Sequence, residues 1–302
     1  MVTQSSSIKA AAMACLLKGL FVIAAMAHAM AAEAAELSTD PGDYVALPPG
    51  TDLGLLYYQH AERDRVKVDG NTVTKNFELD SDIGIARFIH WTQLGNFTVT
   101  PQIILPFGNL DLSGGQSRTA AGVGDPVVGS AIWLINDPVN ERYLAVAGFV
   151  GIPVGTYDAD KANLNLGENR WKAIFHLAYV QPIIPKKLYG EVTLEKDTFG
   201  KNDDYAGATL REDDVFEVQT HLRYALNHTN QLAVSYYHTV GGENHINGLA
   251  QNDAPDTDRF LLTWQHFFNP GLQLQSQIGQ DLDVRNGPEE KLRLNFRLAH
   301  AF

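Results

Sequence analysis

The end of the chain, Leu292-Arg293-Leu294-Asn295-Phe296-Arg297-Leu298-Ala299-His300-Ala301-Phe302, alternates apolar side chains with polar or small ones. Successive side chains of a strand point to opposite faces, so this pattern predicts a strand with one apolar face and one charged face. In a soluble β-sandwich the apolar face would lie in the core. In a membrane barrel it would meet lipid, and the charged face would line the lumen.

The same alternation recurs along most of the chain. It is clear at 97–105, 171–179, 188–195, 216–226, 232–240, 260–268 and 272–278, and less regular at 53–66, 78–91, 123–136 and 141–153. Together with the last segment, this predicts about twelve strands, each long enough to cross a bilayer with tilt.

The connections decide between sandwich and barrel because short and long ones alternate. Short ones fall at 92–95, 137–140, 182–186, 227–228 and 269–270. Long polar ones fall near 62–77, 106–122, 154–168, 199–211 and 242–256, with a shorter one near 285–288. Tight turns at one end and long loops at the other are typical of outer-membrane barrels. We therefore predict an all-β fold, a transmembrane antiparallel up-and-down β-barrel with periplasmic N- and C-termini.

The beginning of the chain predicts export. Lys9 and Lys18 flank an apolar core at 19–27, and Ala29-Met30-Ala31 is a small-x-small cleavage site, so 1–31 is predicted to be a signal peptide. The single cysteine, Cys15, lies within it. We expect a short periplasmic lead-in at 32–51, a barrel at 52–302, and location in the outer membrane of a Gram-negative bacterium.

Charge and the C-terminus indicate the partners. With 23 Lys and Arg against 35 Asp and Glu among 302 residues, the net charge of -12 argues against nucleic-acid binding. A terminal Phe302 preceded by Leu298, Phe296 and Leu294 looks like the outer-membrane assembly signal, although His300 departs from the residues usual at its step. The expected partners are outer-membrane lipid, the outer-membrane assembly machinery and small hydrophobic or aromatic solutes.

Three motifs in order resemble the "MetA-pathway of phenol degradation" family. They are Gly122-Val123-Gly124-Asp125-Pro126, Pro153-Val154-Gly155-Thr156-Tyr157-Asp158 and Asn165-Leu166-Gly167-Glu168-Asn169-Arg170-Trp171. The resemblance covers most of 52–302, and Val154 stands where Thr is commoner. It implies an outer-membrane barrel often found with aromatic-degradation pathways and described as a transporter. The motifs themselves are interpreted as turns and rim residues without substrate contact.

Two serine–histidine pairs are the candidates for covalent catalysis in this sequence. Ser235 and His238 are expected on opposite faces of one strand, and Ser276 and His266 share a face but have no evident orienting partner. The predicted protein is not an enzyme and has no catalytic residue, cofactor or metal site. An outer-membrane hydrolase of phospholipase or esterase type, or a structural barrel without transport, remains the alternative. Acidic residues of the long loops lack calcium-loop spacing and are interpreted as solvated.

The lumen is the remaining candidate site. The alternation places a set of charged and imidazole side chains inward, with acids near 191–217 and bases near 259–297; these are Lys172, His176, Glu191, Glu195, Glu217, His221, Arg223, Arg259, Arg293 and Arg297. Such groups either set a field across an open pore or pair and close it. The predicted function is a channel or transporter for small organic compounds, aromatic or hydrophobic.

Overall fold

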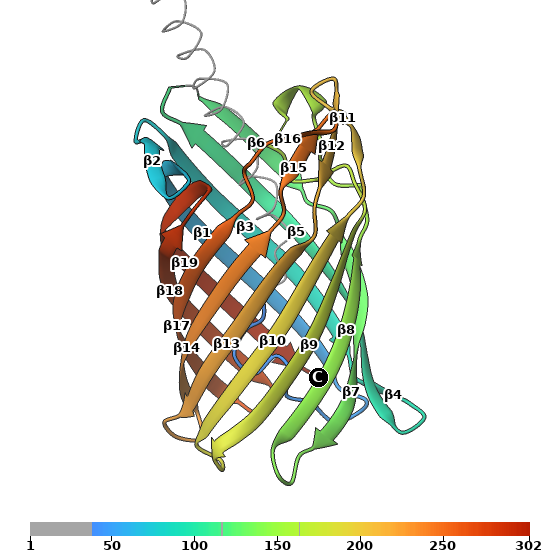
Figure 1. Ribbon diagram of the computed structural model, residues 1–302. Coiled ribbons are helices and arrows are strands. Elements are labelled where there is room, and N and C mark those ends of the chain that lie inside the picture. The colour runs from blue at the N-terminus through green and yellow to red at the C-terminus, as the bar shows by residue number, and fades with distance from the viewer. Residues whose placement is uncertain (1–37, 116, 163) are drawn as a thin grey trace, which may run out of the picture.

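Twelve antiparallel strands close into a barrel in the computed structural model, which describes residues 38–302 except 116 and 163 (Figure 1). Each strand pairs with its neighbour, and the last returns to the first through pairs such as Leu56 with Leu298. The barrel strands are β1 (Asp52–Val68), β3 (Glu78–His90), β5 (Phe97–Ser113), β7 (Val127–Asp137), β8 (Arg142–Gly151), β9 (Lys172–Ile184), β10 (Leu188–Phe199), β13 (Val215–Ala225), β14 (Asn230–Gly241), β17 (Asp256–Asn269), β18 (Leu272–Val284) and β19 (Gly287–Ala301). The predicted fold class is confirmed.

Smaller elements extend the barrel, β4 (Thr92–Leu94) at the end with the short turns and the others at the end with the long connections (Figure 1). β2 (Asn71–Thr74) pairs with β1, and β4 and β6 (Arg118–Val123) pair with β5. A separate sheet, β11 (Asn202–Tyr205), β12 (Ala208–Glu212), β15 (Asn244–Ile246) and β16 (Leu249–Ala250), is built from two long connections, and the η2 turn (Ala159–Lys161) lies in a third. No helix among the described residues is long and apolar enough to cross a membrane.

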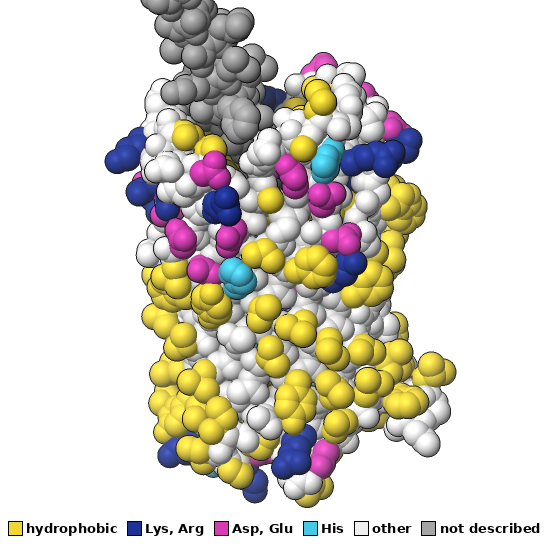
Figure 2. All heavy atoms as spheres, in the orientation of Figure 1, with side chains coloured by type: hydrophobic (Ala, Val, Ile, Leu, Met, Phe, Trp, Pro, Cys, Tyr) yellow, Lys and Arg dark blue, Asp and Glu magenta, His cyan; other side chains and the backbone are white. Residues whose placement is uncertain are grey.

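The outer surface of the barrel is apolar where lipid would lie. Leucine, phenylalanine and other large apolar side chains of nearly every strand are exposed, and Figure 2 shows them as a band with charged side chains gathered beyond it. Exposed apolar surface of this extent needs a non-aqueous environment. Three of the four residues of the predicted assembly signal belong to this surface: Phe296, Leu298 and Phe302 are 44%, 45% and 67% exposed. The fourth, Leu294, is half-buried.

The two ends of the barrel differ as the sequence predicts. One end, here the short-turn end, carries the tight turns and the chain terminus Phe302, and the other, the long-loop end, carries the extended connections (Figure 1). Two barrel strands run further than predicted, because β1 continues to Val68, beyond the strand-like 53–66, and β5 continues through 106–113, which was expected to be a loop. In β1 this stretch is charged, and it pairs its charges across strands, as Lys67 does with Glu289 at 3.1 Å. A polar sequence can therefore be a strand where the barrel rises beyond lipid.

Candidate functional site

Residues 39–46 lie inside the barrel, and we call them the N-terminal segment. The sequence predicts a periplasmic lead-in at 32–51, but the described part of that range enters the lumen before β1 begins. Its contacts are with strands far along the chain: the N–H and the Oγ1 hydroxyl of Thr39 both donate to Gln219 Oε1, each at 2.6 Å. Gly42 N–H donates to Glu191 at 2.7 Å. The prediction did not place this stretch inside the barrel, and the predicted signal peptide lies outside the described residues.

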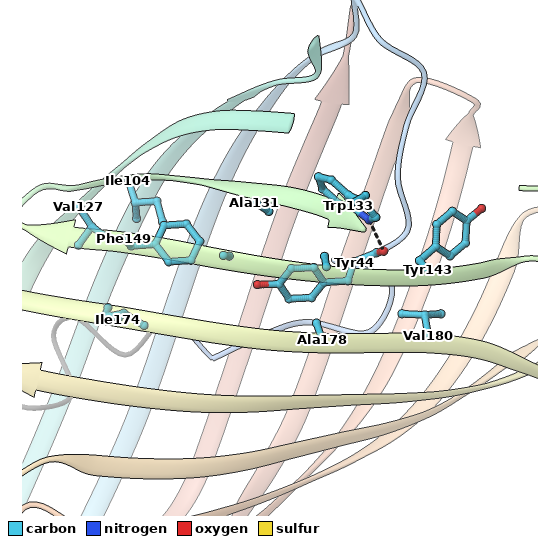
Figure 3. Packing of buried hydrophobic residues seen from close by; sticks show 12 residues of the cluster. Tyr44, Ile104, Val127, Ala131, Trp133, Tyr143, Phe149, Ile174, Ala178 and Val180 are labelled. Carbon is cyan, nitrogen blue, oxygen red and sulfur yellow. Dashed lines mark hydrogen bonds between the residues drawn. The ribbon is translucent and has the colours of Figure 1, made fainter. Parts of the chain in front are cut away.

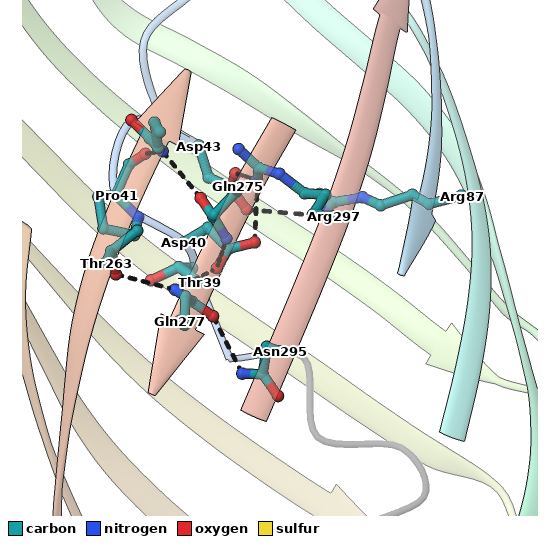
Figure 4. A network of polar contacts seen from close by, with 12 residues as sticks. Thr39, Asp40, Pro41, Asp43, Arg87, Thr263, Gln275, Gln277, Asn295 and Arg297 are labelled. Carbon is teal, nitrogen blue, oxygen red and sulfur yellow. Dashed lines mark hydrogen bonds and ion pairs between the residues drawn. The ribbon is translucent and has the colours of Figure 1, made fainter. Parts of the chain in front are cut away.

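Two carboxylates of the N-terminal segment bind arginines of the wall (Figure 4). Arg297 of β19 donates to Asp40 and Asp43, each at 2.9 Å. Arg87 of β3 donates to Asp43 at 3.4 Å, and Asp40 also accepts from Gln275 at 2.7 Å. These are buried charge-assisted hydrogen bonds, which are stronger than neutral ones and costly to leave unmade.

The two carboxylates respond differently to burial. Burial raises the pKa of Asp40 above its usual value, and the Arg297 guanidinium offsets this only in part. Burial acts in the same direction on Asp43, but Arg297 and Arg87 together outweigh it and hold the Asp43 pKa below its usual value. Asp43 is therefore the carboxylate whose charge favours docking of the segment, whereas the charge of Asp40 opposes it.

The opposite side of the lumen is apolar, and Tyr44 covers it (Figure 3). Ile104, Val127, Ala131, Trp133, Ala145, Phe149 and Ile174 form a buried cluster on the inner faces of β5 and β7 to β9, together with Tyr44. Trp133 Nε1 donates to the Tyr44 carbonyl at 3.1 Å, and the Tyr44 hydroxyl lies 2.6 Å from His176 Nδ1. One lumen wall is thus apolar, the other polar, and the N-terminal segment fills the space between them.

The ten side chains predicted for the lumen all lie on the inner faces of their strands. Nine are buried, and the side chain of Arg259 is 14% exposed. They do not form two opposed ladders across the lumen, because most bind partners on adjacent strands. Lys172 bonds Asp197 at 2.7 Å, His176 approaches Glu195 at 2.8 Å, and Arg223 bonds Glu191 at 2.6 Å. Thr239 donates to Glu217 at 2.6 Å, and Ser235 lies 2.8 Å from His221.

Glu290 organises the remaining bases and is absent from the predicted set. Its carboxylate bonds Arg63 at 2.8 Å and Arg293 at 2.6 Å, and Arg259 lies 3.7 Å away. Arg293 and Arg297 both face inward from β19, but Arg293 binds Glu290 and Arg297 binds the N-terminal segment. The alternation of side chains predicts that Arg293 faces the lumen. Nothing in the neighbouring sequence identifies its acidic partner Glu290, which lies next to a predicted turn.

Two of the cavities that border the N-terminal segment lie at different depths in the barrel. One of about 50 Å³ lies toward the barrel middle, between Thr39, Arg259 and Asn295 among others. The other, about 280 Å³, lies at the short-turn end, between the segment and the ends of β1, β3, β18 and β19. We call the second the short-turn cavity. The N-terminal segment borders both cavities and fills the lumen between them.

The connection between β8 and β9 covers part of the long-loop end. Its Leu164 and Leu166 are 0% and 2% exposed and pack against Val66, Leu79 and Leu110 of β1, β3 and β5. This connection therefore folds inward across the barrel mouth rather than standing out into solvent.

The three motifs singled out in the sequence meet where this connection is anchored to the barrel. Asp125 accepts hydrogen bonds from the N–H groups of Gly155 at 2.7 Å and Glu168 at 2.8 Å, and so joins all three motifs. A side chain at Gly155 would come within 2.7 Å of the Asp125 backbone, so only glycine allows this approach. We call these contacts of Asp125 the clamp. The clamp holds the connection between β8 and β9 in place, in agreement with the interpretation of the motifs as turns.

The family model described as "Putative MetA-pathway of phenol degradation" matches residues 61–298. The chain belongs to this family. All three clamp motifs fall within the matched range. No curated protein sequence matches the chain.

Solved structures agree with the family assignment. The COG4313 outer membrane channel from Pseudomonas putida F1 shares 38% identity with this family member, at a TM-score of 0.83 over 88% of this chain and 100% of that one. The translocator domain of autotransporter NalP from Neisseria meningitidis gives 0.52 at 11% identity, covering 87% and 91%. The transport unit of autotransporter AIDA-I from Escherichia coli gives 0.51 at 7% identity, covering 93% and 96%. The last two show the outer-membrane barrel fold alone.

In this family member, neither serine considered for the hydrolase alternative is paired with its candidate histidine among the described residues. Ser235 is fully buried and points into the lumen, where it pairs with His221 rather than His238. On the outer face, Ser276 is opposite Trp264, and His266 Nδ1 lies 3.0 Å from Asn230 instead. Among the described residues, Asp213, Glu243 and His245 are the one group spaced to hold a metal ion, and they are partly exposed in the long-loop sheet.

Proposed function

We propose that this protein is an outer-membrane channel for small organic compounds, aromatic or hydrophobic, that is closed by its own N-terminal segment. The observation that carries the proposal is the position of residues 39–46 between an apolar wall and a polar wall. If the segment withdrew, it would uncover a passage with one face suited to apolar solutes and one suited to water and charge.

The comparisons support this proposal at two levels. The related structure at 38% identity is an outer membrane channel, and the family description refers to phenol degradation. The buried apolar wall of β7 to β9 adds a physical reason, since Trp133, Phe149 and Ile174 would give a hydrophobic ring a favourable surface along the lumen. No reacting group is required for such passage.

The proposal also assigns an orientation and a route of assembly. The predicted cleavage after Ala31 would free the segment, with the short-turn end toward the periplasm and the long loops outside. Phe302, exposed beside Phe88 at 6.5 Å between rings, would present the assembly signal to the insertion machinery. N-terminal sequencing of protein purified from outer membranes tests the cleavage site.

The decisive experiment compares the full chain with a variant that lacks residues 39–46. Both would be purified from outer membranes, shown to be folded by heat-modifiable gel mobility, and measured in planar bilayers. The deletion should raise single-channel conductance several-fold, because the residues that fill the lumen are gone. Equal conductance in two folded proteins would overturn the closure, and loss of an esterase activity on Ser276→Ala would favour the hydrolase.

A further inference from the structure

Three side chains with metal-binding atoms meet on the long-loop sheet, which is formed by β11, β12, β15 and β16. Asp213 directly follows β12, Glu243 directly precedes β15, and His245 lies within β15. One oxygen of each carboxylate and one nitrogen of the imidazole all lie within 4.8 Å of one another. The group therefore draws on two different connections of the chain, the one between β10 and β13 and the one between β14 and β17.

The spacing of these atoms suits a metal ion. His245 Nε2 lies 3.2 Å from Asp213 Oδ2. Two ligand atoms at the usual zinc distances, in a tetrahedral arrangement, lie roughly 3.3 Å apart, so this pair already has the required separation. Glu243 accepts from the Asn252 N–H at 2.9 Å through one oxygen, which positions its carboxylate and leaves a second oxygen for an ion.

The backbone holds the ligands of the two connections side by side. The N–H of Asp213 donates to the carbonyl of Glu243 at 2.9 Å, and Arg211 of β12 is directly opposite His245 of β15. The positive charge of Arg211 opposes a cation at this place, but the two carboxylates outweigh it and leave a net negative charge. An ion would therefore find three ligands that are close together, held by paired strands and negative in sum.

The long-loop sheet has little apolar core of its own. Among its described residues, Tyr205 and Leu210 are the buried apolar ones, whereas Asn202 and Asn244 are buried polar ones. Small units with so few buried apolar side chains are commonly stabilised by disulfides or metal ions. The single cysteine of the chain, Cys15, leaves no disulfide for this purpose. A bound ion would supply a cross-link that the packing of the sheet does not.

We propose that Asp213, Glu243 and His245 bind a divalent transition-metal ion of the zinc type, which joins the β10–β13 connection to the β14–β17 connection. An imidazole with two carboxylates suits zinc, whereas calcium and magnesium prefer oxygen ligands alone. Three protein ligands leave a fourth position for water. The site lies on the long loops rather than in the lumen (Figure 1), so the inference goes beyond the proposed channel function and does not depend on it.

Calorimetry tests the site on the full chain, purified without a polyhistidine tag and stripped of metal with a chelator. The probes are zinc, calcium and magnesium chlorides, and zinc should bind about 100-fold more tightly than the other two. His245→Gln removes the imidazole and should weaken zinc binding roughly 100-fold, and Asp213→Asn should weaken it at least about tenfold. The matched control is His238→Gln, which should change nothing. His238 Nδ1 also lies 2.7 Å from a carboxylate, that of Asp258, but it belongs to no three-ligand group among the described residues.

A second measurement tests the cross-link. Chymotrypsin added to folded protein should cut after Leu249, which is 71% exposed, more slowly when zinc is present, because the ion ties this connection to its neighbour. Zinc should give no such protection in His245→Gln, and heat-modifiable gel mobility shows that each variant keeps its barrel. Calcium binding as tight as zinc binding, equal zinc affinity in His245→Gln and His238→Gln, or cleavage of the wild type at the same rate with and without zinc would each overturn the proposal.

Discussion

Arg297 on the last strand donates to Asp43 in the N-terminal segment at 2.9 Å, so the end of the barrel holds the chain that precedes its first strand. Arg87 reaches the same carboxylate from β3. Asp43 therefore bridges two strands that flank β1, and we expect closure of the lumen to depend on it most directly.

Asp43→Asn should open the channel more than Asp40→Asn. Asp43 loses a charge that two arginines stabilise, worth roughly 1.5–3 kcal/mol, which corresponds to about a 10- to 100-fold rise in the open fraction. Asp40→Asn removes a charge that burial disfavours, so closure should be kept or strengthened. Open probability in planar bilayers measures both. A larger effect from Asp40→Asn would contradict the assignment.

Acid should act on closure through Asp43. Its pKa in the docked segment lies below the usual value of 3.8, so the stabilising charge is fully present above that value and is lost as the pH falls through the lower, docked pKa. The open fraction of the wild type should therefore rise at strongly acid pH. In Asp43→Asn this acid-dependent component should be missing. An identical acid profile in the two proteins would show that other groups control it.

Tyr44 separates packing from hydrogen bonding on the apolar wall. Tyr44→Phe removes the contact to His176 but keeps the ring against Trp133, so conductance should change little. Tyr44→Ala empties the ring position, at a cost of about 3–5 kcal/mol for an aromatic truncation, and should open the lumen. Equal behaviour of the two variants would mean that the hydroxyl, rather than the ring, holds the segment.

The clamp at the long-loop end can be tested by proteolysis. Asp125→Ala removes two backbone hydrogen bonds to a carboxylate and should free the 152–171 connection, so that protease added to folded protein cuts there faster. Asp137 also accepts a backbone N–H in an exposed turn, from Asn140 at 3.0 Å, so Asp137→Ala is a matched control that should leave the rate unchanged. Equal cleavage in both would show that the clamp does not secure the loop.

Phe302→Asp should lower the amount of folded barrel in the outer membrane. A charge on the lipid face costs roughly 2–4 kcal/mol at the bilayer centre and less near the interface, so the effect through folding stability alone is small there. A sharp loss would therefore come from the insertion signal. Val139→Asp, at an exposed short turn, is a suitable control. The heat-modifiable fraction on a gel measures each.

Strand positions could be predicted where lipid and lumen impose opposite chemistry. β13 shows the alternation of polar and apolar side chains clearly. Glu217 and Arg223 face the lumen, and Phe216 and Leu222 face outward. β7 and β8 do not, because Trp133 and Phe149 face an apolar lumen wall while Leu134 and Val150 face outward. Both faces are apolar there, so the alternation disappears from the sequence although the strand remains.

The closing segment could not be recognised from its own residues. Thr39-Asp40-Pro41-Gly42-Asp43-Tyr44 has the composition of a turn or linker, and its meaning comes from Arg297, Gln219 and His176, which lie far along the chain. A single sequence predicts which side of a strand a residue occupies. It does not predict which of several inward arginines will receive a carboxylate from elsewhere.

The ion pair between Arg297 and Asp43 joins residues that are 254 positions apart in the chain. This separation bears on when the ion pair forms during folding. β19 supplies Arg297 to the closed lumen when it pairs with β1. Contacts between distant parts of a chain form late because they require the loop between them to close first. We therefore expect this half of the seal to form only when the barrel closes, and we expect a barrel whose β1–β19 pairing is incomplete to leak.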